Sequence, residues 1–345
     1  MNNLLKTIVA ASALLAIPSM ATAEEITVVG FGGTLQDALR EAYFAPFDES
    51  SEISLKEDTT NGGLAKLKAM VKSGKVTWDV LQMPRDEMEL ACDEGLLETI
   101  SPKDLGLDGK LIPEATVSDC GVGFFVWSKV LAYDPARLEN TPKTWADLFD
   151  LERFPGPRGL RKNARMTLEI ALLADGVSAA DIYKVLGTED GLQRAFAKLD
   201  TIKKDVVWWE SGAQAPEWLA SGQVVMSSAY NGRIANANKE GRNFGMAWDN
   251  QIFAMEYWAI PRGANVKAAN EFIKFAMTPE RQKAFTEAIP YGVTLKATNA
   301  LIPPKVASQL PTTPENMKTV LPLGATFWVN NRDRLQGRFT KWLAQ

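Results

Sequence analysis

The chain of 345 residues contains no histidine, and this absence excludes several kinds of catalytic chemistry. Histidine is the usual general base near neutral pH and the commonest metal ligand in proteins. A Ser-His-Asp or Cys-His centre is therefore impossible, and a zinc site would have to use carboxylates and two well-separated cysteines. We expect no metal and no cofactor in this protein.

The chain also lacks an excess of positive charge and, after its first residues, any long apolar run. Its formal net charge is −4 at pH 7, which gives no electrostatic reason to expect nucleic acid as a partner. No later stretch is apolar over the roughly 20 residues that a membrane-spanning helix requires. Hydrophobic residues make up 46% of the chain, which suffices for the cores of two domains of about 150 residues each.

The first residues have the pattern of an export signal. Lys6 precedes the apolar segment Ile8–Ile17, and Pro18 and the small residues Ala21–Ala23 follow it. This order of charge, apolar run and small residues is typical of a cleaved signal peptide, with a buried N-terminal helix as the alternative. We expect a signal peptide at residues 1–23, removed on export, and a mature protein in the periplasm.

Cysteine is scarce, with only Cys92 and Cys120 in the chain. An even count in an exported protein favours a disulfide, because the compartment is oxidising. Closing a loop of this size would contribute roughly 3 kcal/mol to stability. Two buried free thiols are the alternative. No CxxC redox spacing is present, so we expect a bond between Cys92 and Cys120 to be structural.

The start of the mature chain repeats a strand–loop–helix order three times. This order predicts a parallel α/β sheet with helices on its faces. The expected strands are one that runs into glycines within Ile26–Gly33, then Ile53–Glu57 and Trp78–Met83. The expected helices begin near Leu35, Leu64 and Asp86.

Two further β-rich runs are unusually long, and a second α/β region lies between them. Val122–Pro135 is too long for one ordinary strand, and the other run lies around Phe253–Ile260. Two such strands can each cross between two lobes, and paired crossings predict a hinge. We assign residues 24–131 and 256–303 to lobe 1, and residues 132–255 and 304–345 to lobe 2.

The glycines after the first strand do not form a dinucleotide-binding motif. Leu35 stands where the GxGxxG pattern requires its third glycine. A tight turn that exposes backbone N–H groups at the start of a helix would instead attract a carboxylate or phosphate group. A simple strand–helix turn is the alternative.

Two charged residues lie beside aromatic ones, and each also has an ordinary structural explanation. Arg233 follows Tyr230 closely, and Glu256 directly precedes Tyr257 and Trp258. An arginine after Asn-Gly can be a solvated helix start, and a glutamate in a strand can face water. The neighbours of Glu256 are apolar, however, and a buried carboxylate needs a partner.

The chain is rich in tryptophan, with ten in all. Trp208, Trp209, Trp248 and Trp258 lie near the polar loops of the middle region. Most tryptophans of soluble proteins belong to the core, which is the alternative for each of these. Together they fit a pocket that holds a cationic or zwitterionic group by cation–π contact.

Across essentially all of the mature chain, the sequence resembles family-1 extracellular solute-binding proteins, most of all their polyamine-type branch. The segment Leu219–Arg233, "LASGQVVMSSAYNGR", is similar to the family's L-x-x-G-x-V-x-x-x-x-x-W-N-G pattern. The segment Ile252–Pro261, "IFAMEYWAIP", is similar to I-F-W-M-D-S-L-A-I-P. The resemblance implies a type II periplasmic binding protein fold, with two α/β lobes linked by crossing strands and a ligand cleft between them. It also implies capture of a small ligand by hinge closure, delivery to an ABC permease, and no catalytic activity.

The resemblance carries over onto particular residues. The family's ligand-stacking aromatic residue corresponds to Tyr230, its amine-binding aspartate to Glu256, and a site tyrosine to Tyr291. The loop after the first strand is here Phe31–Thr34. The candidate ligand-binding residues are Arg233, Glu256, Tyr230, Gly32, Gly33, Thr34, Tyr291, Trp209 and Arg85.

Two departures from the family pattern change the expected ligand. Lys162–Met166 replaces an acidic segment that holds the far ammonium group of a polyamine, and Arg161 lies beside it. Arg233 replaces a small residue after Asn-Gly. Since arginine binds carboxylates in bidentate fashion, we predict a ligand with an amine at one end and a carboxylate at the other, such as 4-aminobutyrate or an opine.

Three alternatives remain open on the sequence. A putrescine or spermidine binder is the nearest, and ferric iron capture is a second possibility within the same family, although no Tyr-Tyr pair occurs. The third is an exported hydrolase that uses carboxylates, although no nucleophile elbow or HExxH motif is present. We expect a monomeric binding protein, not an enzyme, that works with an ABC permease of the inner membrane.

Overall fold

The computed structural model describes residues 24–345, so the predicted signal peptide lies outside the described residues. One ten-stranded sheet runs through the molecule in the order β2-β1-β3-β8-β4-β7-β5-β6, while β10 pairs with β8 and β9 with β4. The strands are β1 Glu25–Gly30, β2 Ser54–Thr59, β3 Val80–Pro84, β4 Val122–Tyr133, β5 Arg158–Arg161, β6 Val206–Trp209, β7 Met226–Tyr230, β8 Gly245–Ala259, β9 Gly292–Val293 and β10 Leu321–Pro322.

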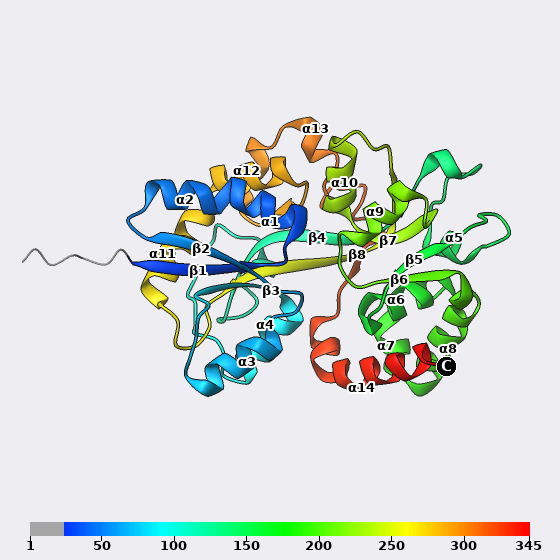
Figure 1. Cartoon of the computed structure of the whole chain (residues 1–345), viewed down its shortest axis with the longest axis horizontal. Helices are drawn as coiled ribbons and strands as arrows, with labels where there is room; N and C mark the ends of the chain where they lie inside the picture. The colour runs from blue at the N-terminus through cyan, green and yellow to red at the C-terminus, as the bar shows by residue number, and fades with distance from the viewer. Residues whose placement is uncertain (1–23) are drawn as a thin grey trace, which may run out of the picture.

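Helices cover the sheet of each lobe (Figure 1). They are α1 Gly33–Leu39, α2 Ala45–Ser50, α3 Leu64–Ser73, α4 Arg85–Asp93, α5 Trp145–Phe149, α6 Ala164–Ala174, α7 Ile182–Leu186, α8 Glu189–Asp200, α9 Gln214–Ser221, α10 Asn231–Lys239, α11 Val266–Ala276, α12 Pro279–Ala288, α13 Pro304–Ala307 and α14 Ala325–Leu343. Within residues 24–345, no helix combines the length and the apolar character needed to cross a membrane.

The predicted parallel sheet of the first lobe is confirmed, because β1 pairs in parallel with both β2 and β3. The first strand ends at Gly30, and the glycines that follow it form the turn that the sequence predicted. Gly32 and Gly33 have φ angles of 70° and 60°, a left-handed conformation that glycine adopts without steric cost and that ends an extended strand. Helix α1 therefore begins directly at Gly33.

The two long β runs do cross between the lobes, as the sequence predicted. β4 and β8 pair antiparallel with each other; β8 also pairs with β3 of the first lobe, and β4 with β7 of the second. Contrary to expectation, Val122–Tyr133 is a single strand of 12 residues. Its pairing with β8 shifts register between Gly123 and Phe125 and again between Lys129 and Leu131, and such bulges let a long strand bend without ending.

The crossing strands are embedded in a core that continues from one lobe into the other. In β4 every residue is buried except Tyr133, which is half-buried. Phe124 stacks on Trp258 of β8 with ring centroids 3.8 Å apart, and an aromatic pair of this kind contributes about 0.5–1.5 kcal/mol beyond its burial. Side chains that point from these strands into the space between the lobes are therefore held on a rigid support.

The predicted disulfide is present between Cys92 and Cys120. It joins the end of α4 to the segment that leads into β4, and the two cysteines are 28 residues apart in the sequence. The bond closes a loop with little regular structure, since the segment between α4 and β4 contains one short 3-10 helix, at Pro113–Thr116.

Candidate ligand-binding site

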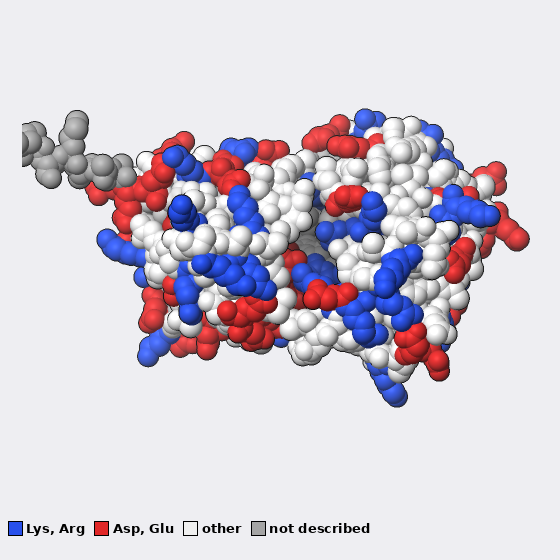
Figure 2. Space-filling view, turned by 60° about the horizontal axis from the view of Figure 1, so that its bottom comes forward, with Lys and Arg blue, Asp and Glu red and all other residues white. Residues whose placement is uncertain are grey.

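A cavity of about 100 Å³ lies between the two lobes, over the crossing strands. On the surface the molecule is hollowed at this place, with basic and acidic side chains at the rim (Figure 2). A volume of this size is only a few times the volume of one water molecule, which suits a small ligand. The charged residues that line the cavity are Glu87, Arg161, Arg165, Glu210, Arg233 and Glu256.

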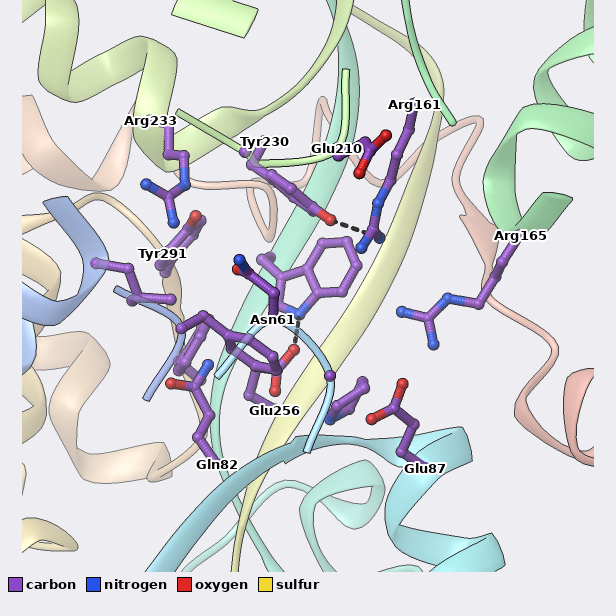
Figure 3. A pocket seen from close by; sticks show the side chains of 17 residues that line it. Asn61, Gln82, Glu87, Arg161, Arg165, Glu210, Tyr230, Arg233, Glu256 and Tyr291 are labelled. Carbon is purple, nitrogen blue, oxygen red and sulfur yellow. Dashed lines mark hydrogen bonds between the residues drawn. The ribbon is translucent and has the colours of Figure 1, made fainter. Parts of the chain in front are cut away.

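Glu256 forms one end of the cavity and is placed there by the alternation of side chains along β8. Its carboxylate oxygen Oε1 accepts a hydrogen bond of 2.8 Å from the indole Nε1 of Trp127 (Figure 3). Its other oxygen, Oε2, is buried and has no hydrogen-bond partner among residues 24–345. Burial raises the pKa of Glu256 to about 8, because removal from water disfavours the charged form.

The amide of Gln82 lies in the same wall and is equally unsatisfied. Gln82 belongs to β3, next to β8 in the sheet, and its residue is 1% exposed. Neither Nε2 nor Oε1 makes a hydrogen bond of normal geometry within the described residues, although the Gln82 side chain lies close enough to Glu256 to lower the pKa of that carboxyl group slightly. Buried polar atoms are nearly always paired in native proteins, so this poorly satisfied pair in the cavity wall indicates a place for a polar ligand group.

Arg233 lies on the opposite side of the cavity from Glu256 (Figure 3). It is 8% exposed, and its Nη2 donates to the carbonyl oxygen of Gly32 at 3.2 Å. A Cβ atom at Gly33 would come within 2.8 Å of Nη1, and one at Gly212 within 2.9 Å of Nε. The guanidinium therefore occupies space that exists only because both positions are glycine.

Arg161 and Tyr230 form the adjoining wall. Arg161 donates from Nη1 to the phenol oxygen of Tyr230 at 3.0 Å. The Tyr230 ring meets Trp127 edge to face at 5.1 Å, and the amine nitrogen Nζ of Lys129 lies 3.3 Å from its centroid. Lys129 is fully buried, and burial, followed by the charges of nearby arginines, lowers its pKa well below the usual range. The Tyr230 ring is thus fixed from several sides.

The charges of the cavity do not balance within the protein. Arg165 pairs with Asp86, Glu87 with Arg332, and Glu210 with Lys162. Among the salt bridges of residues 24–345, none involves Arg161, Arg233 or Glu256. Two guanidinium groups and one carboxyl group therefore face the cavity without an ionic partner, and a ligand with both an acidic and a basic end complements this arrangement.

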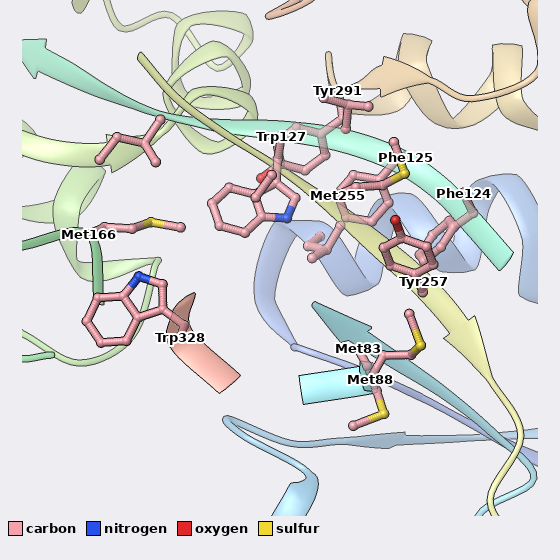
Figure 4. Packing of buried hydrophobic residues seen from close by; sticks show 14 of the residues in the cluster. Met83, Met88, Phe124, Phe125, Trp127, Met166, Met255, Tyr257, Tyr291 and Trp328 are labelled. Atoms are coloured by element: carbon pink, nitrogen blue, oxygen red, sulfur yellow. The ribbon is translucent and has the colours of Figure 1, made fainter. Parts of the chain in front are cut away.

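Four of the predicted site residues are brought together at the cavity: Arg233, Glu256, Tyr230 and Tyr291. Tyr291 stacks on Phe125 of β4 with centroids 4.9 Å apart (Figure 4). The side chains of β4 that reach the cavity, Phe125 and Trp127, follow the two-residue period of a strand. They were missed because the strand up to Trp127 is apolar on both faces, so its sequence pattern does not show which face carries a ligand.

The other predicted residues lie elsewhere. Gly32 and Gly33 are not on the cavity wall; they hold Arg233, and Gly32 offers it a carbonyl group instead of offering N–H groups to a ligand. Thr34 lines a neighbouring hollow on the far side of Arg233. Trp209 is buried behind Tyr230, with ring centroids 5.9 Å apart. Arg85 pairs with Glu89 at 2.6 Å and lies outside the cavity.

Several wall residues had no signal in the sequence. Gln82 lies in the middle of β3, whereas Asn61 and Gly62 come from a loop of the first lobe and Gly212 from a loop of the second. Polar residues and glycines are common in such loops. Their role becomes visible only when the two lobes are placed against each other.

A two-lobe α/β arrangement with a polar cavity over its crossing strands is the fold of the periplasmic binding proteins, as in the similar solved structures. The chain belongs to the bacterial extracellular solute-binding protein family, which residues 42–313 match.

Three similar proteins have described ligands. The gamma-aminobutyric acid-binding protein of Pseudomonas aeruginosa is 48% identical over 331 residues, which cover 96% of this chain and 94% of that protein. The structure of the binding protein AgtB of Agrobacterium tumefaciens, in complex with agropinic acid, is 33% identical with a TM-score of 0.85 and covers 94% of this chain and 100% of its own. A solved GABA receptor is 34% identical with a TM-score of 0.83, over 93% of this chain and 98% of its own.

Proposed function

We propose that this protein is the periplasmic substrate-binding component of an ABC importer and that its ligand is 4-aminobutyrate or a similar ω-amino acid. The observation that carries the proposal is the separation, across one small cavity, of two guanidinium groups from a buried carboxyl group, none of which has an ionic partner among the described residues. Arg233 and Arg161 offer free N–H donors at one side, and Glu256 offers a buried, unpaired oxygen at the other. The matching ligand is a short zwitterion.

In the proposed complex the ligand carboxylate accepts hydrogen bonds from Arg233, with Arg161 nearby. The ligand ammonium donates to Oε2 of Glu256 and to the amide oxygen of Gln82, both unpaired in the structure. The ammonium brings a positive charge beside Glu256 and so lowers the pKa of that carboxyl group. Tyr230 and Trp127 cover the alkyl chain between the two ends.

The similar proteins support this assignment. One relative at 48% identity is described as a binder of gamma-aminobutyric acid, the compound also called 4-aminobutyrate. A second, solved structure is described as a GABA receptor, and AgtB was solved with agropinic acid.

Closure of the lobes would complete the site. We keep the predicted lobe boundaries of 24–131 with 256–303, and 132–255 with 304–345, which place Glu256 and Arg233 on opposite lobes. A ligand that contacts both lobes stabilises the closed arrangement over the open one, and only this difference drives closure. In this proposal the closed protein is the form that an ABC permease recognises. We keep the expectation of an exported monomer whose signal peptide is removed.

A diamine such as putrescine is the second candidate, because Glu256 would also hold an ammonium group and the resemblance includes the polyamine-type branch. A diamine, however, would bring its second ammonium against Arg233 and Arg161. Like charges at that distance repel. The carboxylate of the cavity lining that lies beside Arg161, Glu210, already pairs with Lys162 in the described part of the chain. The structure therefore favours the amino acid.

Calorimetry on the exported chain tests the proposal. 4-Aminobutyrate should bind, putrescine and spermidine should bind far more weakly or not at all, and agropinic acid serves as a larger probe. Arg233→Ala should weaken 4-aminobutyrate binding by about 2 kcal/mol or more, roughly thirtyfold, because it removes a charge-assisted hydrogen bond. Arg85→Ala is the matched control outside the cavity. Tight putrescine binding without any response to amino acids would contradict the assignment.

A further inference from the structure

Asp86 joins the two lobes at the edge of the cavity. It lies in the first turn of α4, in the first lobe, and its side chain is 0% exposed. Its Oδ1 accepts a hydrogen bond from Arg165 at the start of α6, and its Oδ2 accepts one from Arg332 of α14. Both arginines belong to the second lobe, so one buried carboxylate bridges three helices across the cleft.

The bridge extends to a residue of the cavity wall. Arg332 also donates to Oε1 of Glu87 at 3.1 Å, and Glu87 and Arg165 both line the cavity. Two carboxylates of α4 thus meet two guanidinium groups of the second lobe. Burial by itself would raise the pKa of Asp86, but the neighbouring Arg165 and Arg332 outweigh this and lower it, so the carboxylate is charged in the bridge.

The backbone that presents Arg165 is held in an unusual conformation. Met166, the next residue, has a φ angle of 72° although it is not a glycine, a left-handed conformation that is unfavourable for a side chain of this kind. The backbone N–H of Met166 donates a hydrogen bond of 2.8 Å to Oε2 of Glu169. The other oxygen, Oε1, accepts a hydrogen bond of 2.6 Å from Nε1 of Trp328 on α14. Such strain persists only where the surroundings enforce it, and Figure 4 shows Met166 and Trp328 on facing elements.

We propose that Asp86 is a positioning residue for ligand capture: its bridge to Arg165 and Arg332 holds the lobes closed and so sets how long the ligand stays bound. The inference rests on the proposed binding function. When the lobes separate, Asp86 on one side and both arginines on the other become hydrated, so the bridge exists only in the closed arrangement. It therefore acts on ligand release rather than on the first encounter.

Stopped-flow kinetics with 4-aminobutyrate test this inference. Asp86→Asn and Arg332→Gln should each speed dissociation roughly tenfold or more and change the association rate little, because truncating one partner of a buried ion pair acts mainly on dissociation. The double variant should show less than the product of the two single effects, since both substitutions break the same contact. Arg338→Gln is the matched control: it lies on the same helix α14 but pairs with the exposed Glu189 of its own lobe.

Small-angle scattering of the ligand-free proteins adds a readout that does not depend on the ligand. Asp86→Asn should have a larger radius of gyration than the parent, because fewer molecules are closed. If the parent binds 4-aminobutyrate and both variants release it at the parent's rate, the bridge proposal is overturned while the function stands. If the parent does not bind 4-aminobutyrate but Asp86→Asn still has the larger radius of gyration, the proposed ligand is wrong and the bridge proposal stands. If the parent does not bind and the two radii are equal, the proposed ligand and the bridge proposal are both overturned. Should Asp86→Asn fail to fold, Arg332→Gln, a partly exposed position, decides by the same measurements.

Discussion

The indole of Trp127 donates to Oε1 of Glu256 at 2.8 Å and leaves Oε2 of the same carboxyl group buried and without a partner among the described residues. Trp127 lies on β4 and Glu256 on β8, so the bond connects the two strands that cross between the lobes. It fixes the orientation of the carboxyl group, and the free oxygen is directed to the ligand cavity instead of to a protein donor.

Glu256→Gln should weaken binding of 4-aminobutyrate by at least about 1.5–3 kcal/mol, tenfold or more, because a charge-assisted hydrogen bond to the ligand ammonium is replaced by a neutral one. Calorimetry measures the change. Glu89→Gln is the control, since Glu89 pairs with Arg85 outside the cavity. Unchanged affinity in Glu256→Gln would show that the ammonium binds elsewhere.

The raised pKa of Glu256 predicts two pH dependences. With a pKa of about 8 in the folded protein and about 4.3 in the unfolded chain, the folded state holds the extra proton between these values. The free energy of unfolding without ligand should therefore fall as pH rises from about 4.5 to 8. Affinity for 4-aminobutyrate should rise over the same range, because the ammonium requires the ionised carboxylate.

The comparison of parent and Glu256→Gln isolates this group from other titrating residues. In Glu256→Gln, the free energy of unfolding should no longer fall with pH through this group, and the affinity should no longer rise with pH. Urea unfolding at pH 5, 6.5 and 8 measures the first, and calorimetry at the same pH values measures the second. Parallel pH profiles in the two proteins would mean that the carboxyl group titrates in its ordinary range.

Gly212→Ala should reduce ligand affinity although Gly212 bears no charge. The added Cβ would lie 2.9 Å from Nε of Arg233 and 2.9 Å from Cδ2 of Tyr230, so one or both side chains must move. We expect at least a fivefold loss of affinity, about 1 kcal/mol, by calorimetry. Gly337→Ala, where a Cβ meets open space on helix α14, should leave affinity unchanged and stabilise the helix by up to about 1 kcal/mol. Equal affinity in both variants would refute the close fit around Arg233.

Lys129→Met should stabilise the protein at neutral pH. The buried amine has a lowered pKa, so the unfolded chain binds a proton that the folded protein does not, up to the usual lysine pKa of about 10.4. This penalty is greatest at low pH and vanishes above that value. A methionine removes it, with a gain of roughly 1–3 kcal/mol at pH 7 that shrinks toward pH 10.

Thermal unfolding at pH 7 and pH 10 checks the Lys129 prediction, with Lys75→Met, at an exposed position, as the control. A variant that unfolds at a lower temperature than the parent at pH 7 would show that the contacts of the amine with Tyr230 and Trp209 stabilise the fold more than its burial costs.

Local pattern was sufficient for much of the fold. The strand–helix alternation around β1, β2 and β3, the disulfide between Cys92 and Cys120, and the two long crossing strands all follow from periodicity, composition and length, properties that neighbouring residues carry on their own. The glycine turn after β1 was predicted as well, and the positive φ angles of Gly32 and Gly33 show where the strand has to end.

Within the site, the sequence by itself determined the chemical types: an arginine and a glutamate beside aromatic residues, with no histidine to serve a catalytic role. The tertiary structure decided which atoms meet. Trp127 and Glu256 are 129 residues apart, Arg233 and Gly32 201, and Asp86 and Arg332 246. Contacts at such separations depend on strand register and on the packing of one lobe against the other, and these are set by the burial of whole surfaces rather than by any short segment. For that reason Arg85 and Trp209, which were predicted to bind the ligand, lie outside the cavity. The contacts of Asp86 with Arg165 and Arg332 could not be predicted from the sequence for the same reason.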